Sequence, residues 1–143
     1  MGRKVAIDFG LKRLGIAISD ESGLIAMPLP NVEAHKQSET TVDRILKALD
    51  SYEIDEIIVG NPLHLSGRSS FLSDEVKHFV AILEKHVSVG VKLWDERLST
   101  LQAERSLREG NLSRKKRAKL VDSVAAVILL QSFLDSQISE NIV

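Results

Sequence analysis

Residues 4–20 read KVAIDFGLKRLGIAISD and carry the first two predicted strands of the chain. The first six of these residues (4–9) alternate as a strand does, with Asp8 on the opposite face from Ile7. A short turn bracketed by two glycines leads into a second strand at 15–20. Because the link is so short, the two strands are expected to be antiparallel neighbours.

The rest of the chain extends this pattern. A third strand is predicted at 24–30 (LIAMPLP), ended by Pro28 and Pro30. Two further strands are expected, at 55–60 and 89–95. Helices are expected at 38–51 and at about 70–87. Another helix should start after Ser99 and stop before Gly110, and a last one should run from Ser113 to about 136. A meander followed by alternating strands and helices predicts an α/β fold with a mixed five-stranded sheet and helices on both faces.

Length and composition exclude several classes of protein. The chain has 143 residues, so we expect one domain over 1–143. With 43% hydrophobic and 27% charged residues it reads as an ordinary globular protein. The sequence contains no apolar run of roughly 18 residues and does not begin with a signal pattern, so no membrane association is expected. The absence of cysteine excludes disulfides and cysteine-bound zinc, and fits a reducing cytoplasm.

Three carboxylates occur where the hydrophobic pattern makes charge costly. Asp8 ends the first strand, and Glu96 directly follows the fifth strand in KLWDERLST. Asp122 is the only charged residue between Leu120 and Leu134, in an otherwise apolar helical stretch. Burial of isolated carboxylates is costly, so three that converge would need a divalent cation. Oxygen ligands of this kind suit Mg²⁺ or Mn²⁺.

Each of these residues also has an ordinary structural role open to it. Asp8 could hydrogen-bond the turn that follows it, and Glu96 could be a solvated loop residue. Asp122 could face water or pair with an arginine. Spacing along the chain does not decide whether the three carboxylates meet, so both interpretations stay open at this point.

Four blocks of sequence carry residues at fixed spacing. They are Asp8-Phe-Gly-Leu-Lys-Arg13-Leu-Gly15-Ile-Ala17, then Gly60-Asn61-Pro62 with Gly67-Arg68-Ser69, then Asp95-Glu96-Arg97-Leu98-Ser99-Thr100, and finally Asp122-Ser-Val-Ala125-Ala126-Val-Ile128-Leu-Leu-Gln131. These blocks resemble the YqgF/RuvX family, relatives of the Holliday-junction resolvases. They occur in the family's order and cover nearly the whole chain. Asn61 departs from the pattern, because the family more often has leucine there.

The resemblance implies an RNase H-like fold with sheet order 3-2-1-4-5 and strand 2 antiparallel. It places Asp8 on the central strand, Glu96 just beyond the fifth strand and Asp122 on the final helix, as catalytic metal ligands. It also implies a nuclease that matures the 5′ end of the precursor of 16S rRNA in ribosome biogenesis. Resolvases of this fold usually have a fourth carboxylate three residues from the third, where this chain has Lys119 and Ala125. A second metal ion is therefore expected to bind weakly, or only together with substrate.

The leading hypothesis is that Asp8 and Glu96 hold one ion, Asp8 and Asp122 a second, and that a metal-activated water hydrolyses the phosphodiester bond. Positive charge is clustered although the net charge is −1. Candidate phosphate contacts are Lys12, Arg13, Arg68, Arg97, Arg114, Lys115, Lys116 and Arg117. The last four start the final helix, where cations oppose the helix dipole, although they could also form a solvated charged face. Aromatic residues make up only 4% of the chain, which disfavours broad base stacking.

The partners that the resemblance implies are structured RNA, namely an rRNA precursor, and ribosomal particles. Branched DNA is the alternative substrate, as for a Holliday junction resolvase. A non-catalytic nucleic-acid- or ribosome-binding module is a second alternative, favoured by the net charge and the missing fourth carboxylate. A third is an ATP-binding phosphotransferase, because the first block also resembles the phosphate motif of the actin and sugar-kinase superfamily. The length of 143 residues argues against it, since those proteins use two such lobes.

Overall fold

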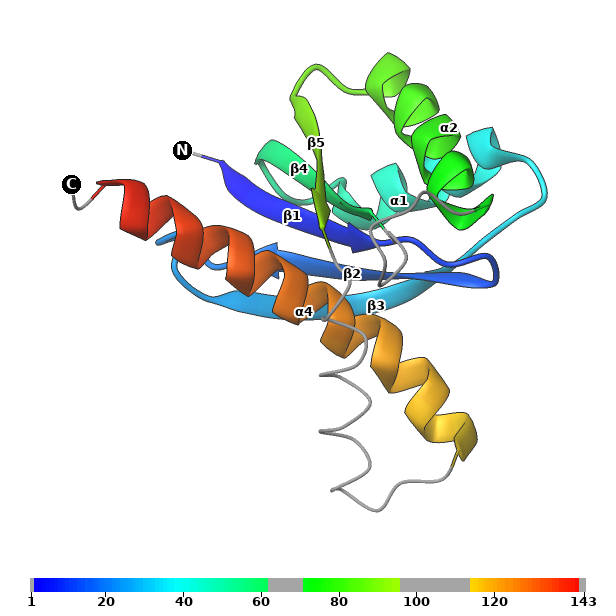
Figure 1. The fold of residues 1–143 in the computed structure, drawn as a ribbon. Helices are drawn as coiled ribbons and strands as arrows, with labels where there is room; N and C mark the ends of the chain where they lie inside the picture. Colours follow the sequence, from blue (N-terminus) through cyan, green and yellow to red (C-terminus); the bar gives the residue numbers. More distant parts are fainter. Residues whose placement is uncertain (1, 62–70, 96–113, 142–143) are drawn as a thin grey trace.

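The computed structural model describes residues 2–61, 71–95 and 114–141, and Figure 1 shows how its elements are arranged. The strands are β1 (Arg3–Asp8), β2 (Arg13–Ser19), β3 (Ala26–Glu33), β4 (Ile54–Asn61) and β5 (Gly90–Asp95). The helices are α1 (Ser38–Leu49), α2 (Phe71–His86) and α4 (Arg114–Asn141). This order confirms the predicted three strands followed by alternating helices and strands. The helix predicted after Ser99 lies outside the described residues.

The five strands form one sheet in the order β3-β2-β1-β4-β5, as the family resemblance implied. β2 is antiparallel to both of its neighbours, β1 and β3. β4 is parallel to β1 and to β5, so these three strands end at the same edge of the sheet. We call this edge the carboxyl edge. It lies at the arrowheads of β1, β4 and β5 (Figure 1).

The path of β3 contradicts the prediction that Pro28 and Pro30 end the third strand. β3 continues through both prolines to Glu33. In the described sheet β3 is an outer strand that pairs only with β2, so its other side needs no amide donors. Proline is tolerated there, and it hinders the addition of a further strand along that side.

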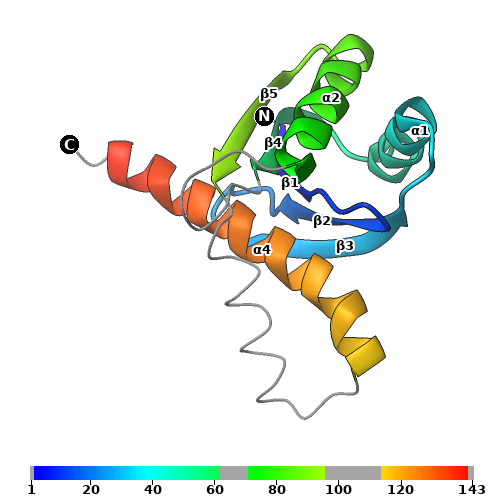
Figure 2. The same ribbon diagram turned by 45° about the vertical axis from the view of Figure 1, so that its right-hand side comes forward.

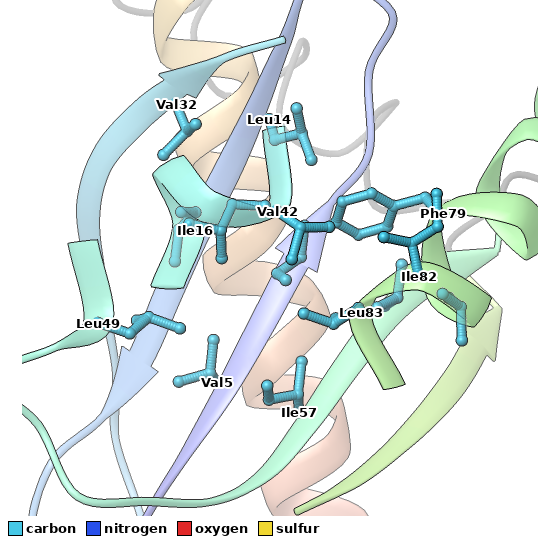
Figure 3. Packing of buried hydrophobic residues seen from close by; sticks show 14 of the residues in the cluster. Val5, Leu14, Ile16, Val32, Val42, Leu49, Ile57, Phe79, Ile82 and Leu83 are labelled. Carbon is cyan, nitrogen blue, oxygen red and sulfur yellow. The ribbon is translucent and has the colours of Figure 1, made fainter. Parts of the chain in front are cut away.

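Helices cover both faces of the sheet, as predicted, and Figure 2 shows α1 and α2 on one side and α4 on the other. Under α1 and α2 lies a core of buried side chains that includes Val5 of β1. Figure 3 shows Val42 of α1 and Phe79 and Leu83 of α2 meeting over this side of the sheet. The apolar spacing of both helices therefore predicted their buried faces correctly.

The opposite face of the sheet carries small residues, which allow α4 to lie close to the strands. Ala6 of β1 and Ala17 of β2 are fully buried against Ala126 and Leu129 of α4. Trp94 of β5 meets Phe133 of α4 edge-to-face at 5.3 Å between ring centroids. α4 ends at Asn141, later than the predicted residue 136. Within the described ranges, no helix is both long and apolar enough to cross a membrane.

Candidate functional site

Asp8, the last residue of β1, is the only buried charged side chain among the described residues, with 7% of its surface exposed. It lies on the central strand, opposite Gly15 of β2. Because side chains alternate along a strand, Asp8 faces the same side as Ala6, the side covered by α4. Asp8 does interact with its surroundings. A carboxylate kept at this depth is nevertheless costly, which marks it as a candidate functional group.

The carboxyl edge brings the ends of the three parallel strands together. Ile7 of β1 pairs with Val59 of β4, so Asp8 lies level with the next residue of β4, Gly60. At the end of β5, Asp95 pairs with Asn61 of β4. Sequence reasoning had given neither Asn61 nor Asp95 a role, because a pairing between two distant strands leaves no local signal. Glu96 follows Asp95 in the chain but lies outside the described residues.

Asp122 lies on α4, where the structure describes the backbone but not this side chain. It stands four residues before Ala126 and seven before Leu129, and both of these are fully buried against the sheet. Residues at this spacing share one face of a helix. Asp122 is therefore in helical register with two residues of α4 that pack on the sheet.

The predicted basic residues fall into three groups. Lys12 is exposed in the turn after β1, and Arg13 begins β2, where it makes an interaction with its surroundings. Both therefore lie at the carboxyl edge beside Asp8. The four cations at 114–117 form the first turn of α4, whose side chains are not described, at the yellow end of the helix in Figure 1. Arg68 and Arg97 lie outside the described residues.

Gly10 makes the tight turn from β1 to β2 possible. A Cβ atom at this position would press against the backbone carbonyl oxygen of Arg13. Only glycine avoids this contact, because the obstacle is backbone and cannot swing aside. The turn returns the chain at once, and this keeps Lys12 and Arg13 next to the end of β1.

Gln131 fastens α4 to the start of β3. Its side-chain oxygen accepts a hydrogen bond of 2.9 Å from the backbone N–H of Ala26, and its amide nitrogen donates one of 2.8 Å to the carbonyl of Leu24. The amide nitrogen also donates to a carboxylate oxygen of Asp135 at 3.0 Å. The sequence places Gln131 in the fourth block, but its hydrogen bonds between α4 and the start of β3 are visible only in the structure.

Two shifted pKa values lie away from the carboxyl edge. Burial alone would lower the pKa of Lys4, but the hydrogen bond and charge of Asp55, at 2.8 Å, together with Glu56 raise it overall. The hydroxyl of Ser22 and then the backbone N–H of Ile25 hydrogen-bond the carboxylate of Asp20 and lower its pKa. Both groups make structural contacts at the end of the sheet opposite the carboxyl edge.

No group of three or more histidine, cysteine, aspartate or glutamate side chains that could hold a metal ion occurs within the described residues. Of the three predicted ligands, Asp8 is the one whose side chain the structure describes. Its chemistry fits a hard cation, because it offers carboxylate oxygens in a buried position.

Comparison with known proteins gives consistent matches. The family model described as "RuvX: Holliday junction resolvase" matches residues 2–136. A protein of Protochlamydia amoebophila (strain UWE25) named "Putative pre-16S rRNA nuclease" is 52% identical over 141 residues, covering 94% of each chain. A protein of the same name from Geobacillus sp. (strain WCH70) is 40% identical over 136 residues, covering 94% of this chain and 99% of that one.

A solved structure supports the fold. It is described as "T. thermophilus RuvC in complex with Holliday junction substrate", and it matches with a TM-score of 0.58 at 18% identity, covering 96% of each chain. At this identity the likeness concerns the fold, which is RNase H-like as predicted. With a family model spanning most of the sequence and relatives matched along almost their full length, the chain belongs to the RuvX (YqgF) family.

Proposed function

We propose that this protein is a metal-dependent nuclease that hydrolyses phosphodiester bonds in structured nucleic acid, and that its substrate is the precursor of 16S rRNA. The observation that carries the proposal is the buried carboxylate of Asp8 at the end of the central strand. The curated relatives, named as pre-16S rRNA nucleases, match almost the whole chain and support the same activity. Matches of this extent give no support to the ATP-binding alternative.

The direction of α4 supports a place for Asp122 near Asp8. Gln131 contacts Ala26, which pairs with Ser19, and the hydroxyl of Ser19 accepts a hydrogen bond from the N–H of Lys4 near the start of β1. From Gln131 back to Asp122, nine residues of helix span roughly 14 Å. From Lys4 to Asp8, four residues of strand span roughly 13 Å. If the helix follows the strand, the two aspartates come level at the carboxyl edge.

We assign Asp8, Glu96 and Asp122 as the ligands of Mg²⁺ or Mn²⁺. Glu96 directly follows Asp95, which the pairing with Asn61 holds at the carboxyl edge. A bound divalent ion would supply an activated water and neutralise charge on the phosphate. The role of Asp8 is to fix the position of the ion at the rigid end of a central strand. Its burial excludes bulk water from one side of that position.

The basic residues are assigned to the phosphate backbone of the substrate. Lys12 and Arg13 flank Asp8 at the carboxyl edge, and we add Arg68, Arg97 and the cations at 114–117 of α4 on sequence grounds. Such contacts position a nucleic acid without reading its sequence. We further propose that residues 1–143 act as one domain, on ribosomal particles in the cytoplasm.

A second candidate function is cleavage of branched DNA. The description of the matching family as a Holliday junction resolvase favours it. Phosphate contacts and metal ligands serve DNA and RNA equally, so the substrate has to be distinguished by experiment.

The test is cleavage of a pre-16S rRNA fragment with Mg²⁺ or Mn²⁺, beside a four-way DNA junction, by the natural protein and by Asp8→Asn. We expect metal-dependent cleavage of the RNA and its loss in Asp8→Asn, with the fold retained in circular dichroism. Asp43→Asn on α1 is a matched control at an exposed aspartate and should cleave normally. Full activity of Asp8→Asn would refute the metal-ligand assignment, and cleavage of the junction alone would favour the resolvase.

A further inference from the structure

A hollow of about 190 Å³ opens at the end of β1, on the face of the sheet covered by α1 and α2. Three segments line it: residues 9–11 after β1, the link and first turns of α1, and the side chains of Glu75 and Phe79 from α2. The hollow is smaller than the roughly 300 Å³ at which pockets for drug-sized ligands begin, so it suits a single ring system.

The hollow is built from ordered parts. Phe9 and Phe79 meet with ring centroids 5.2 Å apart and give it an apolar floor. The hydroxyl of Thr41, a residue only 3% exposed, accepts a hydrogen bond of 2.9 Å from the N–H of His35 and donates to the carbonyl of the same residue. These bonds fix the link before α1 against the helix, so the wall of the hollow is formed before any ligand arrives.

Glu75 and His35 are two of the polar residues that line the hollow. Glu75 is half-buried, and no hydrogen bond or ion pair joins it to any residue in the described ranges, so its carboxylate oxygens are open acceptors. His35 accepts a hydrogen bond of 3.1 Å at Nδ1 from the backbone N–H of Gln37. Because a neutral imidazole has one donor nitrogen, its proton must lie on Nε2. The lining therefore combines a carboxylate acceptor with a ring N–H donor.

This combination selects a class of ligand. The carboxylate of Glu75 would repel a phosphate group at the floor. One carboxylate is too few oxygen ligands for a divalent cation. A flat heterocycle with adjacent N–H donors and a carbonyl acceptor satisfies both groups, and guanine has this arrangement in N1–H, N2–H₂ and O6. Lys36, exposed at the rim, can meet the phosphate of the same nucleotide.

We propose that this hollow binds one unpaired guanine base of the nucleic acid, next to the phosphodiester bond that is cleaved. The inference rests on the proposed nuclease function. Asp8 and Phe9 are consecutive and point to opposite faces of the sheet. A strand that crosses the end of β1 can therefore present its phosphate on the Asp8 side while its neighbouring base enters the hollow.

Binding of nucleoside monophosphates to the full ¹⁵N-labelled chain tests the proposal without requiring cleavage. Guanosine 5′-monophosphate should shift the amide signals of Gly10, Leu11 and Lys36 in the millimolar range. Inosine monophosphate, which lacks the 2-amino group, should bind more weakly, and uridine monophosphate weakest. Glu75→Gln should weaken guanosine monophosphate at least tenfold, because an amide offers one acceptor oxygen in place of two. Glu84→Gln, an exposed position on the same helix, should bind as the natural protein does.

Equal affinity for the guanosine and uridine nucleotides, an unchanged affinity in Glu75→Gln, or shifts confined to other amides would each overturn the proposal. The experiment also separates its failure from that of the nuclease assignment. If the protein binds guanosine monophosphate but cleaves no substrate, the guanine site is supported and the nuclease assignment is refuted. If it cleaves but binds no nucleotide, the nuclease assignment is supported and the guanine site is refuted. Asp8→Asn should retain the guanosine monophosphate affinity in full.

Discussion

Replacement of Gln131 by leucine tests whether α4 is held to the sheet by the side-chain amide. Leucine is close in size and a good helix former, so Gln131→Leu removes the hydrogen bonds without lowering helix propensity. The N–H of Ala26, a residue with only 9% of its surface exposed, would lose its acceptor. The carbonyl of Leu24 and the carboxylate of Asp135 are exposed, so water can replace the amide there.

The expected cost follows from this difference in exposure. An unpaired buried donor costs about 1–3 kcal/mol, whereas an exposed acceptor that turns to water costs a few tenths. We therefore expect Gln131→Leu to lower the free energy of unfolding by about 2 kcal/mol. For a chain of this size that corresponds to a fall in melting temperature of about 4–8 °C.

Chemical and thermal denaturation monitored by circular dichroism would measure the loss. Ser132→Ala is a suitable control, because Ser132 is the exposed neighbour of Gln131 on α4. It should change the free energy of unfolding by less than about 0.5 kcal/mol. A Gln131→Leu protein as stable as the Ser132→Ala protein would show that apolar packing alone holds the helix, and would refute the reasoning.

Two further predictions concern the turns of the sheet. Gly10→Ala should destabilise the fold by roughly 1 kcal/mol or more, because the new Cβ meets the carbonyl of Arg13. Gly90→Ala is the control and should be tolerated, because a Cβ atom at Gly90 meets no atom within 4 Å. Equal melting temperatures of the two variants would contradict this explanation. The pKa of Asp20 is lowered in the folded protein, so its contribution to stability is complete above the ordinary carboxyl pKa and is lost as the pH falls through the lowered value. The difference in melting temperature between the natural protein and Asp20→Asn should therefore shrink between pH 6 and pH 3, and a difference independent of pH would argue against these hydrogen bonds.

Local pattern was sufficient to predict most of the fold. The alternation in residues 4–9 placed Asp8 on the opposite face from Ile7, and the structure confirms it with α4 over one and α1 and α2 over the other. The failure at Pro28 and Pro30 has a physical cause. A proline ends a strand only where both sides need amide donors, and the sequence does not reveal that β3 is an outer strand of the described sheet.

For the candidate site, the sequence indicated individual residues but not their arrangement. Asp8 and Asp122 were conspicuous because each interrupts an apolar run. Asn61 pairs with Asp95 across two strands, and Gln131 accepts a hydrogen bond from Ala26. Each contact joins segments far apart in the sequence, so no local pattern predicts it. The hollow beside Phe9 likewise depends on three segments that meet only in the folded chain.

The hydrogen bond from Ala26 to Gln131 joins residues 105 positions apart, and this has a consequence for biosynthesis. At 5–20 residues per second, roughly 5–20 s of translation separates the two residues. During that interval the apolar face around Ala6 and Ala17 has no α4 to cover it. A nascent chain of this protein must therefore extend through α4 before this face of its sheet is covered.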